Sequence, residues 1–148
     1  MKHYRLILGA CLTAVLTFPA AAEEAPQEIR HELMESVGDA AEPLGGMLKG
    51  EREFDAEVAM ESLRTFQQAA AEFGDLFPEG SDTGYDTEAR STIWSDRAGF
   101  ETALASFGEA VDTAIAAQPQ SLDELKPVAG AVFKQCKGCH EDYRIEDD

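Results

Sequence analysis

Apolar residues recur at steps of three and four along most of the chain, which is the spacing of one face of an α-helix. The series falls into four separate stretches, and none of them shows the alternating pattern of a β-strand. The pattern predicts helices over about residues 26–48, 55–77, 87–117 and 121–143. We expect the apolar stripes to meet in a common core that includes Leu33 and Val37, Leu63 and Phe66, Phe100 and Phe107, and Leu125 and Val132.

Local signals mark the ends of these helices. Asp55 is a predicted N-cap of the second helix, and Ser121 with Glu124 forms a capping-box pattern at the start of the fourth. Residues 78–84 have the composition of a loop, and Pro127 is expected to shift the start of the fourth helix or to bend it. Long amphipathic helices with short links predict an all-α fold, an antiparallel left-handed four-helix bundle with helices crossing at about 20°.

The N-terminus has the pattern of a secretory signal peptide. Lys2 and Arg5 form a basic opening, residues 6–18 are mostly apolar, and three alanines end at Ala22. The apolar run is too short to span a bilayer, which argues against a membrane anchor. We therefore expect residues 1–22 to be cleaved and residues 23–148 to be one domain, exported to the periplasm and free of the membrane.

Acidic residues dominate the composition, with 29 Asp and Glu against 12 Lys and Arg and a formal net charge of −17. This charge argues against a nucleic-acid-binding protein, because phosphate contacts need clustered basic side chains. The same charge favours a basic protein partner through long-range attraction. We find no nucleophile elbow, phosphate-binding loop or distinct pair of carboxylates, so we do not expect an enzyme.

The chemistry of the chain is concentrated in Cys136-Lys137-Gly138-Cys139-His140, since Cys11 leaves with the signal peptide. The C-x-x-C-H pattern is the attachment sequence for c-type haem. Two cysteines three residues apart share a helix face, so both thiols reach the two vinyl groups of one haem and form thioether bonds. His140 is then the proximal axial ligand of the iron. Covalent attachment takes place after export, so the leader and the motif support each other.

Three other interpretations use the same residues. A thioredoxin-like dithiol centre would stand at a helix N-terminus after a strand, whereas this pair lies late in a helix. A zinc site needs four ligands, which Cys136, Cys139, His31 and His140 could supply in number but not in any zinc-finger spacing. A Cys136–Cys139 disulfide is expected only in protein that has not received haem.

The motif and the residues after it, Cys136 to Arg144, end within eight residues of the C-terminus. This segment and its position resemble class II c-type cytochromes, the cytochrome c′ group. Further similarities lie in residues 30–34, 47–51, 54–55, 76–80 and 93–96, so the resemblance covers nearly all of the mature chain. It implies a four-helix haem-binding domain with one haem c. It also implies a homodimer that forms through the first two helices.

The resemblance further implies roles for single residues. Met34 stands where the family carries its distal residue, and in an antiparallel bundle it lies at about the level of His140, whereas Met47 is about 20 Å further along the helix. We therefore expect Met34 as a distal ligand, with a space-filling core methionine as the alternative. Arg30 is expected at a haem propionate, and Arg144 beside the proximal imidazole or the haem edge. The alternative for each arginine is a solvated surface charge.

Two functions follow from these expectations. The first is one-electron transfer by an iron that has two axial protein ligands. The second is the binding or scavenging of NO or CO at a five-coordinate iron with an open distal side. The two differ in whether the Met34 sulfur occupies the iron, which the sequence leaves open.

Overall fold

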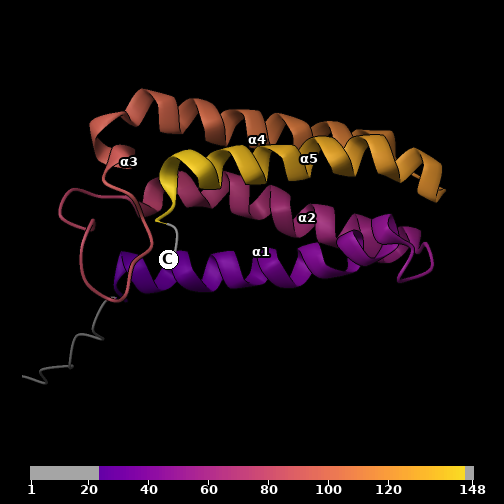
Figure 1. The fold of residues 1–148 in the computed structure, drawn as a ribbon, viewed down its shortest axis with the longest axis horizontal. Coiled ribbons are helices and arrows are strands. Elements are labelled where there is room, and N and C mark those ends of the chain that lie inside the picture. Colours follow the sequence, from indigo (N-terminus) through magenta and orange to yellow (C-terminus); the bar gives the residue numbers. More distant parts are fainter. Residues whose placement is uncertain (1–23, 146–148) are drawn as a thin grey trace, which may run out of the picture.

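The computed structural model describes residues 24–145. Four long helices run alternately in opposite directions, and they form an antiparallel bundle (Figure 1). Residues 24–145 contain no strand, so the predicted all-α four-helix bundle is confirmed. The predicted signal peptide lies outside the described residues. The elements are α1 (Pro26–Lys49), α2 (Ala56–Glu72), the 3-10 helix η1 (Phe73–Leu76), α3 (Thr92–Ser95), α4 (Arg97–Ala117) and α5 (Leu122–Tyr143).

The predicted capping residues act as expected. The Asp55 carboxylate accepts hydrogen bonds from two backbone N–H groups of the first turn of α2, and the Ser121 hydroxyl accepts one from Glu124. These bonds pair N–H groups that have no partner within the helix. Pro127 does not delay α5, because the Ser121 cap already fixes the start of the helix at Leu122.

The predicted third helix is wrong at residues 87–91 and is interrupted at Asp96. Residues 87–91 are not helical, α3 is a single turn, and α4 starts only at Arg97. The Asp96 side chain accepts a hydrogen bond from the Gly99 N–H and so caps a new helix in place of continuing the old one. The second helix also ends early, because residues 73–76 tighten into a 3-10 turn before the loop.

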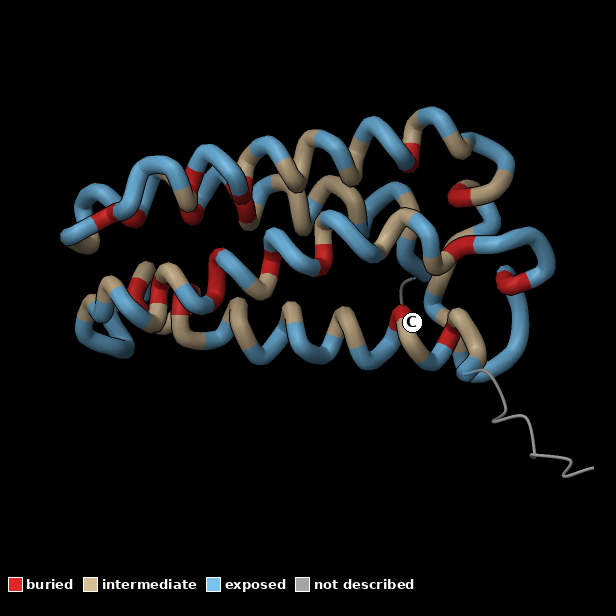
Figure 2. The backbone as a smooth tube through the Cα atoms, turned by 180° about the vertical axis from the view of Figure 1, so that it is seen from behind, coloured by how far each residue is buried: buried red, intermediate tan, exposed pale blue. Residues whose placement is uncertain are grey.

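Two groups of buried side chains hold the bundle together (Figure 2). The larger group joins all four long helices, and its main members are Leu44, Met47, Leu63, Phe66, Val111, Leu125 and Val132. The smaller group lies near the other end and consists of Phe77, Ile93 and Phe100, with Trp94 packed against Phe77. Burial of these apolar side chains is the main favourable term in folding. No helix within residues 24–145 is long and apolar enough to cross a membrane.

The four helices do not contact one another equally. Among the four pairs of neighbouring long helices, α4–α5, α1–α2 and α2–α4 pack closely, whereas α1 and α5 make the least contact. The middle of α1, residues 31–41, is therefore only half-buried or exposed. This separation leaves room between α1 and α5, where the candidate site lies.

Candidate functional site

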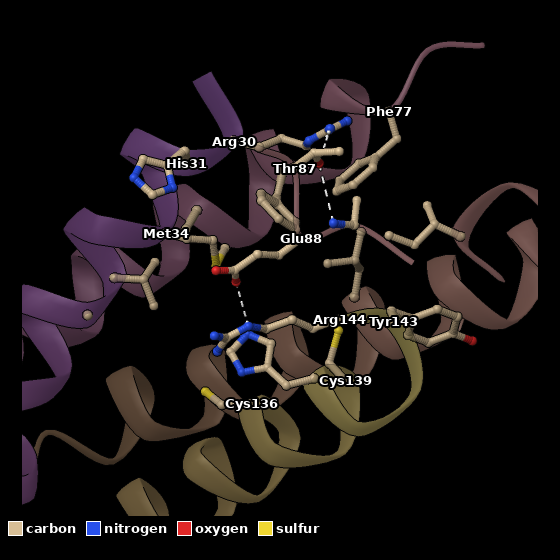
Figure 3. A pocket seen from close by; sticks show the side chains of 18 of the residues that line it. Arg30, His31, Met34, Phe77, Thr87, Glu88, Cys136, Cys139, Tyr143 and Arg144 are labelled. Carbon is tan, nitrogen blue, oxygen red and sulfur yellow. Dashed lines mark hydrogen bonds and ion pairs between the residues drawn. The ribbon is translucent and has the colours of Figure 1, made fainter. Parts of the chain in front are cut away.

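A cavity of about 480 Å³ lies between α1, α5 and the loop that joins η1 to α3 (Figure 3). Ligand pockets in proteins are typically about 300–1,000 Å³ in volume. All six residues that the sequence singled out line this one cavity: Arg30, Met34, Cys136, Cys139, His140 and Arg144. Helices that are far apart in sequence thus bring together the residues of a single predicted site.

The α5 wall of the cavity carries the C-x-x-C-H residues. Cys136 and Cys139 are half-buried, with free thiols one helical turn apart, and His140 follows on the same wall. Figure 3 shows Cys136 and Cys139 on the α5 side of the cavity, and His140 also lines it. The helical geometry therefore presents two thiols and an imidazole to one bound group, as the spacing predicts.

The thiols are held in the protonated form. Burial raises the pKa of Cys136, and burial together with the nearby Cys136 and Asp142 raises the pKa of Cys139 to about 11. A dithiol redox centre needs a thiolate with a lowered pKa. Because the pKa values of both thiols are raised and not lowered, they argue against a thioredoxin-like site.

The imidazole is held in the neutral form. Partial burial and the positive charge of Arg144 lower the pKa of His140, and Glu88 opposes them with a smaller effect. A histidine must be neutral to bind a metal through its ring nitrogen. His140 therefore has the protonation state that an axial ligand requires.

The zinc interpretation finds no support in the geometry. His31 lines the cavity but is exposed, and its nearest acidic partner is Glu35, at 3.6 Å between the ring nitrogen and the carboxylate. Within residues 24–145, no three His, Cys, Asp or Glu side chains come close enough together to hold a metal ion. A closed zinc site needs four ligands.

Met34 extends into the cavity from α1 (Figure 3), and His140 lines the same cavity from α5. Met47 is fully buried in the larger core, at the far end of the helix. Gly38 lies one turn beyond Met34 on the cavity wall, where a Cβ atom would meet nothing within 4 Å. The centre of α1 therefore offers a thioether and unfilled space side by side.

Arg30 lines the cavity, but its guanidinium is committed to the adjacent loop. Nη1 donates to the Leu76 carbonyl and the Ser81 hydroxyl, each at 3.0 Å. Nη2 donates to the Ser81 carbonyl and the Thr87 hydroxyl, each at 2.9 Å. The guanidinium also lies over the Phe77 ring, 4.6 Å from its centre. Since its four terminal N–H groups are used in this way, Arg30 holds the loop in this structure and does not present them to the cavity.

Arg144 lies at the mouth of the cavity and pairs with Glu88. The distance between Nε of Arg144 and Oε2 of Glu88 is 2.6 Å, and both side chains are about half exposed. The sequence does not predict Glu88 as a site residue, because the residue falls inside the expected third helix. The two residues are 56 positions apart, and no local pattern in the sequence points to their pairing.

The cavity fits a large, flat apolar group. Its walls are mainly apolar, and the side chains that provide them include Val37, Ala41, Phe73, Phe77, Leu104, Phe107 and Phe133. Polar groups gather at the mouth, where Arg144 and Glu88 lie. Two thiols at haem-attachment spacing and a neutral imidazole complete a donor set suited to a covalently bound haem.

Comparisons with known proteins agree with this geometry. A family model described as cytochrome C′ matches residues 25–144. Cytochrome c′ of Rhodopseudomonas palustris is 39% identical, over 79% of this chain and 80% of the relative. Cytochrome c-556 of Agrobacterium tumefaciens strain apple 185 is 31% identical, over 86% of this chain and 100% of the relative.

Solved structures show the same similarity. That of cytochrome c′ from Rhodopseudomonas palustris has a TM-score of 0.81 and 32% identity, and it covers 85% of this chain and 100% of that protein. A nitric oxide complex of a cytochrome c prime variant from Alcaligenes xylosoxidans has a TM-score of 0.72 and 25% identity, and it covers 82% and 94% of the two chains.

The raised thiol pKa values predict slow alkylation of the haem-free chain. At pH 8 a pKa of about 11 in place of 9.0 leaves Cys139 with about one hundredth of the ordinary thiolate fraction, so its reaction with iodoacetamide should be slower by a similar factor. The rate should climb as the pH rises towards 11, because the thiolate fraction grows. The measurement uses folded apo-protein, with urea-unfolded chain as the control. Equal rates in the two samples at pH 8 would contradict the prediction.

Proposed function

The chain belongs to the cytochrome c′ family, and on that premise we propose that it is an exported cytochrome that carries out one-electron transfer. Haem c is the cofactor of this family, so the expected cofactor is confirmed, as is the expectation that the protein is not an enzyme. When bound, the haem supplies an iron that cycles between the ferric and ferrous states. The observation that carries the proposal is that Met34 of α1 and His140 of α5 line one apolar cavity.

We assign the attachment of haem to α5. Cys136 and Cys139 would hold it through thioether bonds to its two vinyl groups. His140 would bind the iron as the proximal ligand, with its neutral imidazole held by the last turn of α5. These roles follow from the attachment motif and from the placement of all three side chains on one wall.

We assign the distal position to Met34. A thioether is a soft ligand that stabilises ferrous iron and raises the reduction potential, which suits an electron carrier. The apolar walls would exclude water from the iron, which would also raise the reduction potential. Arg144 would meet a propionate or the proximal haem edge at the mouth, and Arg30 would support the haem edge through the loop that it holds.

The alternative function is binding of NO or CO at a five-coordinate iron. Two observations favour it: the open space beside Gly38 on the distal wall, and the similarity to a solved cytochrome c prime that holds nitric oxide. Under this alternative Met34 fills space beside the haem and leaves the iron open.

Optical spectra of the reduced protein, with and without CO, separate the two functions. We expect a sharp low-spin α band that CO leaves unchanged, because the Met34 sulfur already occupies the sixth position. Met34→Ala should give a broad high-spin spectrum, and this spectrum should change when CO is added.

The matched control is Met60→Ala, which removes a half-buried methionine on α2, away from the cavity, and should keep the wild-type spectrum. A wild-type protein that binds CO fully would favour the gas-binding alternative. A Met34→Ala spectrum identical to wild type would exclude Met34 as a ligand.

The charge of the chain supports a basic redox partner in the periplasm. Removal of residues 1–22 takes away Lys2 and Arg5 and no carboxylate, which brings the formal charge from −17 to −19. Such a field accelerates encounter with a positively charged protein. The homodimer through the first two helices stays a prediction, and sedimentation of the haem-loaded protein would test it.

Electrostatic attraction of this kind weakens as salt is added. The rate of electron exchange with a basic redox protein should fall steeply between low and physiological ionic strength, because mobile ions screen charges over about 10 Å at 0.1 M salt. Stopped-flow absorbance of the haem band measures this rate. A rate that does not change with salt would contradict the proposed steering.

A further inference from the structure

The last turn of α5, which carries His140, is held from outside by the segment 88–92. The final four carbonyl groups of a helix have few or no partners within it and need others. In α5 these are the carbonyls of residues 140–143. Within residues 24–145, the His140 carbonyl is the one of these four that receives its bond from the next residues of the chain, from the Arg144 N–H at 3.1 Å.

Arg90 and Thr92 supply the other partners. Nη1 of Arg90 donates to the Glu141 carbonyl at 2.9 Å and to the Asp142 carbonyl at 3.4 Å. The Thr92 hydroxyl donates to the Asp142 carbonyl at 3.0 Å, and the Arg90 backbone N–H donates to the Tyr143 carbonyl at 2.9 Å. A single arginine thus satisfies three carbonyls and places a positive charge at the negative end of the helix dipole.

The same segment of chain is fixed at its other end to α1. The Arg30 guanidinium binds Ser81 and Thr87, and the Gln27 side chain donates to the Thr83 carbonyl at 2.9 Å. Residues 81–92 therefore form a strap between the two helices that carry Met34 and His140. These two helices make less contact than any other pair of neighbouring long helices, so the strap adds a physical link between the two walls at this end of the cavity.

We propose that Arg90 is a positioning residue for the haem: it locks the last turn of α5 and so fixes His140 relative to Met34 on α1. The inference rests on the proposed function in giving His140 and Met34 to the iron. Arg90 does not line the cavity, so its effect passes through the α5 carbonyls and not through contact with the cofactor.

The test uses the haem-loaded protein and three variants. Arg90→Ala removes the guanidinium bonds, and Arg90→Lys keeps a cation with donors at the end of the helix. Arg97→Ala is the matched control, because Arg97 also donates to two backbone carbonyls, those of Gly74 and Phe77, but makes no such bond to α5. Two quantities are measured: hydrogen exchange of the backbone amides of residues 138–144, and the midpoint potential of the iron.

In Arg90→Ala we expect exchange in residues 138–144 to become about tenfold faster, while exchange in residues 125–133 stays unchanged. The midpoint potential should shift downward, because a less firmly held His140 would weaken the arrangement in which His140 and Met34 would hold the haem and Met34 would stabilise ferrous iron. Arg90→Lys should recover part of both effects. Arg97→Ala should lower the melting temperature and leave both quantities at their wild-type values.

Wild-type exchange and potential in Arg90→Ala would overturn the proposal, as would equal shifts in Arg97→Ala. The outcome is separable from that of the proposed function. If the chain carries no haem, the proposed function fails, and the exchange of residues 138–144 still decides whether Arg90 locks the turn. If haem is bound and Arg90→Ala exchanges like wild type, the positioning role alone fails.

Discussion

The structure depends on keeping α1 and α5 apart while the rest of the bundle packs tightly. In a closed four-helix bundle each helix buries an apolar stripe against two neighbours. Here the centre of α1 and the last third of α5 leave such side chains facing a cavity, and the other three helix pairs carry the packing. In our proposal the haem would lie between these two helices and would restore the missing contact. It would then be part of the core as well as the functional group of the protein.

A buried charge at the end of the bundle helps to maintain this separation. Arg30 is almost fully buried, and a buried guanidinium is tolerated only when its donors are paired. Its terminal donors are satisfied by loop carbonyls and hydroxyls, and its flat face lies on the Phe77 ring. The loop is thereby ordered around α1, and the following residues reach the end of α5. The hydrogen bonds of Arg30 thus help to position two helices that have little direct contact.

The sequence predicts the features that depend on local patterns. Helical periodicity predicts the four long helices, and the caps at Asp55 and Ser121 act through neighbouring residues, so short-range reasoning finds them. The C-x-x-C-H motif identifies one wall of the cavity for the same reason. Met34 could be placed opposite that wall because helix length and antiparallel order fix its level.

The features that the sequence does not predict depend on distant partners. Residues 87–91 are expected at the start of the third helix, yet residues within this segment bond to the end of α5 instead. The Glu88–Arg144 pair joins residues 56 positions apart, and Arg30 finds its partners 46 to 57 residues away. No periodic signal encodes such pairs. Arg30 was accordingly expected at a propionate, whereas the structure shows it bonded to the loop.

The most direct test of the central claim is the mass of the intact protein purified from the periplasm. Our interpretation predicts a coloured protein with the mass of residues 23–148 plus one haem, which stays attached after denaturation because the thioether bonds to Cys136 and Cys139 are covalent. A colourless protein with the mass of the bare polypeptide would contradict it.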